Sequence, residues 1–147
     1  MNADQLFQIC NFLVLPVWLL LLVAPRWQWT VRVADTCVVP LLLAAVYAVL
    51  IVRSMLGEGS GFDFSSLEAI RGLFDDPYAL LAGWIHYLAF DLFIGSWEVR
   101  DSQRLGLPHL LVLPCLVLTF VLGPVGLLAY FVLRWTRGEL LVAHSTA

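Results

Sequence analysis

Charge is scarce in this chain of 147 residues: Asp, Glu, Lys and Arg together make up 13% of it, whereas 61% of the residues are hydrophobic. Soluble domains average about 25% charged and about 45–50% apolar residues, so the composition argues against an ordinary soluble domain. Lysine is missing altogether, because all eight basic residues are Arg. With a formal net charge of −3, the chain lacks a polybasic surface for the phosphates of nucleic acid. Nucleic-acid partners are therefore set aside.

Cysteine is also rare, and the three present, Cys10, Cys37 and Cys115, lie in apolar runs without CxxC spacing. This pattern argues against a zinc finger, a redox motif and a disulfide framework. We expect the three thiols to be packing residues. The sequence contains no GxSxG elbow and no phosphate-binding loop, so it offers no signature of nucleophilic catalysis either.

Long apolar runs dominate the sequence instead. A helix needs roughly 20 mostly apolar residues to cross a bilayer core of about 30 Å. Four segments meet this requirement, at about 7–24, 36–52, 77–96 and 110–133. Indoles prefer the membrane surface, and four of them fall at or just beyond the predicted ends: Trp27, Trp29, Trp97 and Trp135. The sequence predicts an all-α membrane protein, a single domain of four transmembrane helices surrounded by lipid.

Prolines interrupt these predicted spans. Pro16 should kink the first span, because proline removes one helical hydrogen bond and clashes with the preceding turn. The fourth span contains no charged residue, but Pro114 and Pro124 should bend it. Its Gly123-Pro124-Val125-Gly126 sequence should break the helix, or let a neighbouring helix or an apolar ligand approach its backbone.

The connection between the second and third spans begins with the flexible stretch from Gly57 to Gly61. Ser65-Ser66-Leu67-Glu68 matches a capping box at the start of a short helix. Apolar residues then gather mainly on one face of that helix: Phe64, Leu67, Ile70, Leu73 and Phe74. We predict an amphipathic helix over about 65–75 on the membrane surface, with packing on the mouth of the bundle as the alternative. Residues 137–147 are expected to form a frayed tail.

Arginine counts leave the membrane orientation open. Four spans would put both ends of the chain on one side, together with Arg53, Arg71, Arg134 and Arg137. Four arginines would lie on the other side: Arg26, Arg32, Arg100 and Arg104. Cytoplasmic loops carry the excess of basic residues in membrane proteins, and here the two sides are tied.

Ionisable side chains in and after the third span are the main functional candidates, because such groups are costly at membrane depth unless paired. His86 and Asp91 point about 140° apart on a regular helix, so they are poor joint ligands for one ion. Asp91 can share a helix face with Glu98 and Asp101. His109 lies at the start of the fourth span, close to the end of the third.

Three interpretations of this cluster stay open. As a metal site, the three carboxylates and His109 would suit a divalent ion such as iron, manganese or zinc, although the Glu-x-x-His pair of di-iron bundles is missing. As an acid–base site, a desolvated carboxyl group would donate a proton and a histidine accept one. As a purely structural cluster, the carboxylates would pair with Arg100, Arg104 and tyrosine hydroxyls of neighbouring helices.

Aromatic side chains within the spans are candidates for binding a long, flat, apolar substrate, although packing against lipid is the commoner use of such residues. They are Trp18, Tyr47, Trp84, Tyr87 and Phe90.

A series of short motifs resembles the neoxanthin synthase family, small four-span membrane proteins of the abscisic-acid-deficient type. The motifs are Val14-Leu15-Pro16, Ala24-Pro25-Arg26, Trp84-Ile85-His86, Asp91-Leu92-Phe93, Pro108-His109 and Gly123-Pro124-Val125-Gly126. The resemblance covers nearly the whole chain. It implies a carotenoid-like polyene as ligand and an isomerisation that opens an epoxide to an allene without net redox change. It also assigns His86, Asp91 and His109 to matched positions, and carboxyl and imidazole groups suit the proton transfers of that reaction.

Arg without any Lys suggests a bacterial source, and hence the inner membrane. In plants the neoxanthin synthase family is implicated in converting violaxanthin to neoxanthin. Most bacteria make no violaxanthin, so another carotenoid and a metal-assisted reaction such as cleavage are further options. We expect an integral membrane enzyme that modifies a carotenoid-like lipid, with a divalent metal as the one cofactor considered. The alternative is a non-catalytic carotenoid- or lipid-binding subunit of a membrane complex. Assembly as a homo-oligomer is left open.

Overall fold

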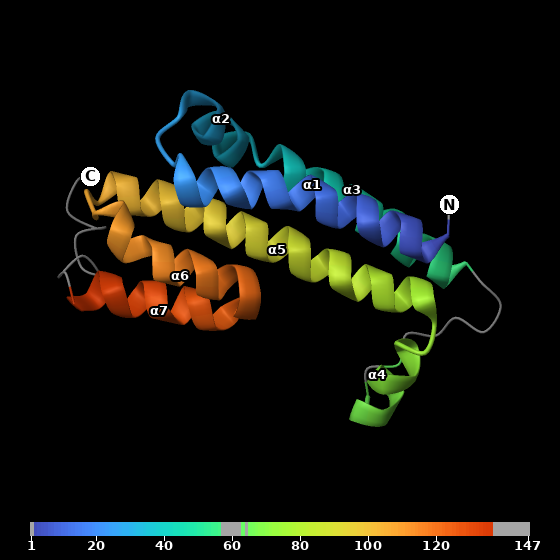
Figure 1. Cartoon of the computed structure of the whole chain (residues 1–147). Coiled ribbons are helices and arrows are strands. Elements are labelled where there is room, and N and C mark those ends of the chain that lie inside the picture. Colours follow the sequence, from blue (N-terminus) through green and yellow to red (C-terminus); the bar gives the residue numbers. More distant parts are fainter. Residues whose placement is uncertain (1, 57–62, 64, 137–147) are drawn as a thin grey trace, which may run out of the picture. The chain divides into compact units, whose positions relative to one another are not determined.

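The computed structural model describes residues 2–56, 63 and 65–136, and all regular secondary structure within them is helical. The helices are α1 (Ala3–Val23), α2 (Gln28–Thr36), α3 (Val38–Met55), α4 (Leu67–Leu73), α5 (Pro77–Arg104), α6 (His109–Leu122) and α7 (Pro124–Thr136) (Figure 1). The predicted all-α class is confirmed. The stretch from Gly57 to Gly61, Phe64 and the predicted tail 137–147 lie outside the described residues.

Three helical stretches among the described residues are long and apolar enough to cross a membrane, namely Ala3–Val23, Gln28–Met55 and Pro77–Arg104. Few side chains of the first two are covered, since 28% and 22% of their most apolar windows are buried. Large apolar residues such as Phe12 and Val49 face outward. An apolar exterior of this kind is typical of helices surrounded by lipid, and the chain is a membrane protein.

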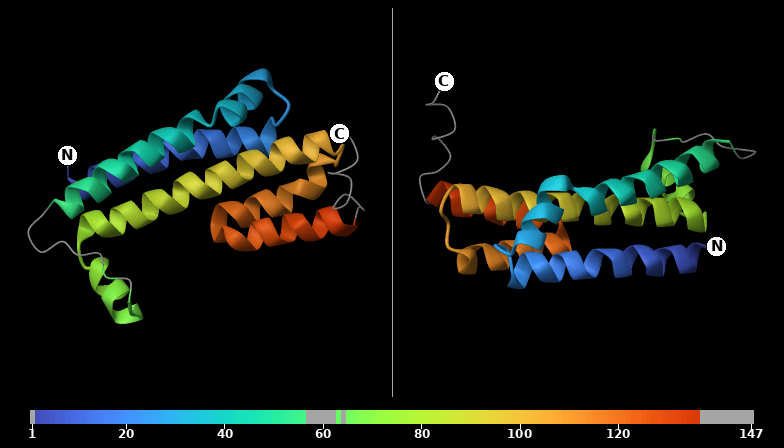
Figure 2. Two further views of the ribbon diagram at one scale, coloured as in Figure 1. Left: turned by 180° about the vertical axis from the view of Figure 1, so that it is seen from behind. Right: turned by 90° about the horizontal axis from the view of Figure 1, so that it is seen from above.

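The predicted fourth span is corrected by the structure, because a single helix over 110–133 does not form. Gly123 ends α6 with φ 50° and ψ −99°, and Pro124 starts α7. The two helices run antiparallel, side by side (Figures 1 and 2). They measure about 21 and 20 Å at 1.5 Å per residue, too short for a core of about 30 Å. A side chain at Gly126 would collide with Thr119, so this glycine lets α7 approach α6 closely.

Helix α2 is absent from the sequence-based expectation, in which the second span simply began near residue 36. Its sequence, QWTVRVADT, is polar enough to escape a search for apolar runs. The helix ends because Cys37 adopts a left-handed conformation with φ 50°, and α3 begins at the next residue. A residue of this conformation commonly terminates a helix.

Helix α4 confirms that a short helix follows the capping sequence. Its cap is Ser66 rather than Ser65, and the Ser66 hydroxyl accepts a hydrogen bond from Ala69 N at 3.1 Å. None of the seven residues of α4 is buried, and Leu67 is 83% exposed. An uncovered apolar residue on this helix agrees with a surface role, and its position on the membrane stays a prediction.

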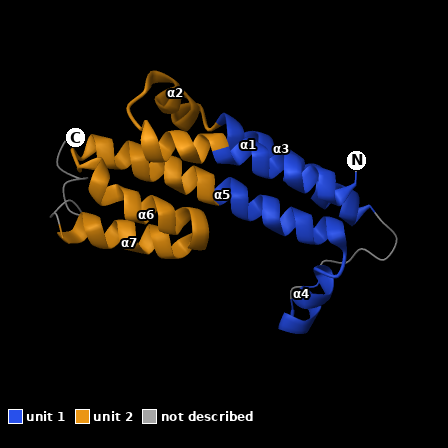
Figure 3. Ribbon diagram, in the orientation of Figure 1, with its two compact units in different colours: residues 1–15, 38–90 blue, residues 16–37, 91–147 orange. Residues whose placement is uncertain are grey.

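The chain forms two compact units, which Figure 3 distinguishes by colour. Unit 1 comprises Met1–Leu15 and Val38–Phe90, and unit 2 comprises Pro16–Cys37 and Asp91–Ala147. Helices α1 and α5 therefore contribute residues to both units. Buried apolar residues of unit 1 include Val14, Leu43, Ile85 and Leu88. Those of unit 2 include Trp18, Leu21, Leu92, Val112 and Leu116.

Candidate functional site

The second half of α5, which belongs to unit 2, carries three buried carboxyl side chains. Asp91 is 8% exposed, Glu98 0% and Asp101 6%. Their spacing brings all three to one face of a helix with 3.6 residues per turn. Each lies beside a residue of the hairpin that α6 and α7 form. We call these three side chains the carboxylate row.

Asp101 is held by several partners. Its Oδ1 accepts a hydrogen bond from Arg104 Nη2 at 2.9 Å, and its Oδ2 accepts one from the Tyr130 hydroxyl at 2.8 Å. Arg134 Nη1 lies 3.4 Å from the same Oδ2, and the Arg134 side chain is only 9% exposed. The Arg134 guanidinium also lies 6.0 Å from the ring centroid of Trp97. Two cations and a hydroxyl satisfy this carboxylate, so its role is structural.

Glu98 has a different environment on the same helix face. It is completely buried, and its Oε1 accepts a hydrogen bond from the Thr119 hydroxyl at 2.9 Å. Its buried Oε2 has no hydrogen-bond partner among the described residues. Glu98 also forms no ion pair with any of the described residues. A buried carboxyl group is rarely left so incompletely satisfied, which makes Glu98 the most unusual member of the row.

Asp91 lies beside the turn that joins α6 to α7. A Cβ atom at position 123 would lie 2.7 Å from Asp91 Oδ1, so a larger residue here would force the Asp91 carboxyl group to move. Gly123 also has a backbone conformation that other residues rarely adopt. The turn at Gly123 and the Asp91 carboxyl group are therefore closely packed against each other. Among the described residues, Arg104 and Arg134 form salt bridges with Asp101 and none with Glu98.

The histidines of the predicted site have surroundings of their own. His109 belongs to unit 2, where its Nε2 lies 2.9 Å from the backbone carbonyl oxygen of Leu22. His86 belongs to unit 1, where its exposed ring stacks on Phe90 at 4.5 Å between centroids and lies 5.6 Å from Tyr47. Salt bridges between a histidine and the carboxylate row are absent from the described residues.

The predicted metal ligands do not converge. Within residues 2–56, 63 and 65–136, no group of three or more His, Cys, Asp or Glu side chains could hold a metal ion. The four predicted ligands, Asp91, Glu98, Asp101 and His109, instead have the separate surroundings described above. Cys10 and Cys115 are buried free thiols, and Cys37 is a partly buried one.

The aromatic residues predicted to bind substrate are divided between the units. In unit 1, Trp84 packs on Phe7 and Tyr87 with centroids 5.7 and 5.4 Å apart, and its Nε1 donates to Asn11 Oδ1 at 3.2 Å. Phe7 and Asn11 also line a surface groove of about 340 Å³ on α1. In unit 2, Trp18 is buried and packs edge-on against Phe120. Phe7, Trp84 and Tyr87 thus form an aromatic cluster in unit 1.

The comparison with known proteins decides the family. The sequence pattern of the ABA DEFICIENT 4-like family matches residues 5–130. The chain belongs to this family. The protein named ABA DEFICIENT 4, chloroplastic, from Arabidopsis thaliana is 29% identical over 140 residues, and the match covers 90% of this chain. The chain spans 61% of the length of that relative. No solved structure matches it. The family resemblance predicted from the order of the motifs is confirmed.

The match to the ABA DEFICIENT 4-like family contains the whole carboxylate row and stops before Arg134. Sequence reasoning missed Thr119, Tyr130 and Arg134, which contact the row from the hairpin. A signal for two of them is present, because Tyr130 and Arg134 are four residues apart and therefore share a face of α7. Thr119 stands out only as a polar residue in an otherwise apolar helix.

Proposed function

We propose that this member of the ABA DEFICIENT 4-like family is a bacterial inner-membrane enzyme that isomerises a carotenoid-like polyene by acid–base chemistry. Family membership and the apolar exterior support a lipid-soluble substrate. Arg without any Lys supports the bacterial source. The observation that carries the catalytic part is the contrast along α5: Asp101 pairs with Arg104 and Arg134, whereas Glu98 has one hydroxyl donor and no ion pair among the described residues.

The proposed reaction conserves every atom of the substrate. A proton goes to the epoxide oxygen while its C–O bond breaks, and a proton leaves a carbon of the polyene as the allene forms. The oxygen ends as a hydroxyl group, and no electron acceptor is needed. A carboxyl group can take part in both transfers, because its O–H donates and its second oxygen accepts. We assign these transfers to Asp91 and Glu98: Asp91 lies in a motif matched by the family resemblance, and Glu98 is the carboxyl group without an ion pair among the described residues.

His86 and His109 stay candidates for the same proton transfers. His109 Nε2 already faces the Leu22 carbonyl oxygen, and His86 lies in unit 1 among aromatic rings. The carboxyl groups therefore come first in the test. Trp84, Tyr87, Phe90 and Tyr47 are proposed to contact the polyene chain, since flat apolar molecules stack on aromatic rings.

Expression in a carotenoid-producing bacterium, followed by chromatography of the pigments, tests the proposal. The wild-type chain should form an isomer of unchanged mass, and Asp91→Asn or Glu98→Gln should lower its yield by at least about 100-fold, the usual contribution of acid–base catalysis. Glu68→Gln is the matched control, because Glu68 is 84% exposed on α4 and should leave the yield unchanged.

Pigment that stays bound to the purified protein separates the two functions. Asp91→Asn should keep the bound pigment while losing conversion. If the wild-type chain binds pigment and yields no product in any host, the enzyme proposal is wrong and the binding subunit of a membrane complex takes its place.

A further inference from the structure

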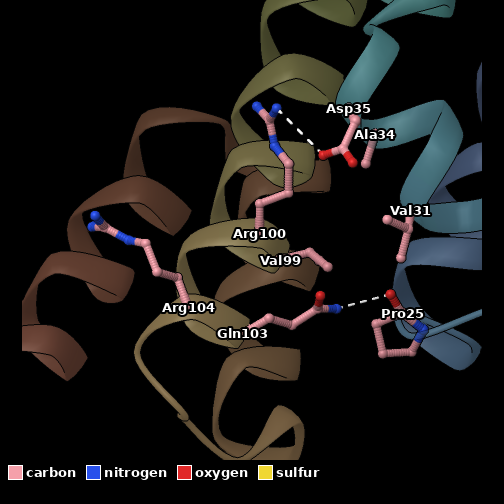
Figure 4. Close-up of a pocket in the computed structure, with 8 residues that line it drawn as sticks. All are labelled: Pro25, Val31, Ala34, Asp35, Val99, Arg100, Gln103 and Arg104. Atoms are coloured by element: carbon pink, nitrogen blue, oxygen red, sulfur yellow. Dashed lines mark hydrogen bonds and ion pairs between the residues drawn. The ribbon is translucent and has the colours of Figure 1, made fainter.

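Unit 2 contains a pocket of about 400 Å³ on a side of α5 that the carboxylate row does not use (Figure 4). Pro25 of the connection between α1 and α2, the helix α2 and the last turns of α5 surround it. Its polar lining consists of Asp35, Arg100, Gln103 and Arg104, and Val31, Ala34 and Val99 form much of its apolar wall. The proposed isomerisation requires none of these side chains.

Arg100 is the incompletely satisfied group in this pocket. Its Nη1 lies 3.8 Å from Asp35 Oδ1, which is too far for a hydrogen bond. Its Nε is buried and has no hydrogen-bond partner among the residues that the structure describes. Figure 4 shows this guanidinium group and the Asp35 carboxylate opposite each other at one end of the pocket. A buried donor in this state favours an acceptor from a ligand.

The remaining lining is positively charged overall. Arg104 donates from Nη2 to Asp101, but its side chain is 65% exposed and a guanidinium carries five N–H donors. The Gln103 amide nitrogen donates to the Pro25 carbonyl oxygen at 2.8 Å, which fixes one wall. The lining thus contains two arginines and one aspartate: the Arg100 guanidinium lies opposite Asp35, and Arg104 extends away from Asp35 (Figure 4). By formal charge the lining carries one excess positive charge, which suits an anion.

The surroundings of the pocket identify the source of that anion. Trp27 and Trp29, at the start of α2, are 50% and 51% exposed. Exposed indoles beside a charged helix end are typical of the headgroup layer of a membrane. Phospholipid phosphates lie in this layer, and the planar fork of a guanidinium matches two oxygens of a phosphate. We propose that Arg100 binds the phosphate of a phospholipid headgroup in this pocket, with Arg104 adding positive charge to its lining.

Native mass spectrometry of the full chain in detergent, titrated with phosphatidylglycerol, tests this site. The wild-type chain should retain one lipid molecule, and Arg100→Gln should weaken its affinity at least about tenfold, as expected for the loss of a charge-assisted hydrogen bond. Arg100→Lys should fall between the two, because a lysine keeps the charge and loses the fork. Arg32→Gln is the matched control, since Arg32 packs on Trp29 and does not line the pocket.

A second variant protects the test against misfolding of the first. Asp35→Asn keeps both arginines and removes the one carboxylate, so phosphatidylglycerol should bind more tightly. Unchanged affinity in both Arg100→Gln and Asp35→Asn would overturn the proposal, as would equal retention of a glycolipid that has no phosphate. Inorganic phosphate that binds in an Arg100-dependent way while phosphatidylglycerol does not would show a site for free phosphate and also overturn it.

Discussion

Replacement of Arg134 by Met should destabilise unit 2 by about 3 kcal/mol. Arg134 is 7% exposed and lies 3.4 Å from Asp101 Oδ2, so the substitution leaves a buried carboxylate with fewer counter-charges. Loss of one partner from a buried ion pair costs about 3–5 kcal/mol. The lower end applies here, because Arg104 and the Tyr130 hydroxyl still contact Asp101. Methionine fills a similar volume and can keep the contact with the Trp97 ring.

Denaturant titration in detergent micelles, followed by far-UV circular dichroism, measures this loss. The double variant Asp101→Asn/Arg134→Met should lose less than the sum of the two single variants, because the two side chains interact. Arg71→Met is the control, since Arg71 forms an exposed ion pair with Glu68 and should change little. If Arg134→Met is as mild as Arg71→Met, or if the two single losses simply add, the buried network is not what stabilises the contact between α5 and α7.

Two further substitutions test the hairpin and unit 1. Gly123→Ala should lower the free energy of unfolding by about 1–3 kcal/mol in the same titration, because the residue has a φ of 50° and its Cβ would meet Asp91. Gly72→Ala is the control and should be harmless or slightly stabilising, because a Cβ there meets nothing within 4 Å. Equal effects of the two substitutions would contradict the special role of Gly123. Asn11→Leu should cost about 1 kcal/mol by removing the acceptor of Trp84 Nε1, and it should cost nothing further in a Trp84→Phe background.

Hydropathy is sufficient to predict the long apolar helices, because their length and composition are read directly from the sequence. Helices α1, α3 and α5 lie close to the expected spans, because a run of about 20 apolar residues has few other stable arrangements in lipid. The spacing of Asp91, Glu98 and Asp101 likewise predicts a common face, since it depends only on the helical repeat. The family could be predicted from the order of short motifs spread over most of the chain.

Features that depend on one backbone angle or on a partner from another helix escaped prediction. The sequence from Gly123 to Gly126 indicated a helix break as one alternative, but hydropathy averaged over 110–133 is almost insensitive to the positive φ of Gly123, so the antiparallel return of α7 was not predicted. The choice of partner for Asp101 depends on how α7 packs, so Arg104 was foreseen and Arg134 was not. Arg100 was expected to pair with the carboxylate row and instead lies near Asp35.

The hairpin predicts a membrane topology that differs from the four spans expected from the sequence. If α1, α3 and α5 cross the membrane while α6 and α7 enter and leave on one side, the chain crosses three times rather than four. The start of α1 and the end of α7 then lie on opposite sides. The described arginines no longer balance, because one side keeps only Arg53 and Arg71. The other side has five of them: Arg26, Arg32, Arg100, Arg104 and Arg134.

The arginine-rich side should be cytoplasmic, because short cytoplasmic loops carry the excess of Lys and Arg. Alkaline phosphatase, which is active only outside the cytoplasm, should therefore be active when fused after Met55 and inactive when fused after Arg104 or Thr136. Four spans require the opposite pairing, with the Thr136 fusion behaving like the Met55 fusion. The comparison of Thr136 with Arg104 thus tests the hairpin itself whichever way the protein is oriented. An active Arg104 fusion would contradict only the orientation inferred from the arginines. The hairpin determines that the ends of α5 and α7 lie on the same side of the membrane, whereas the distribution of arginines predicts which side is cytoplasmic.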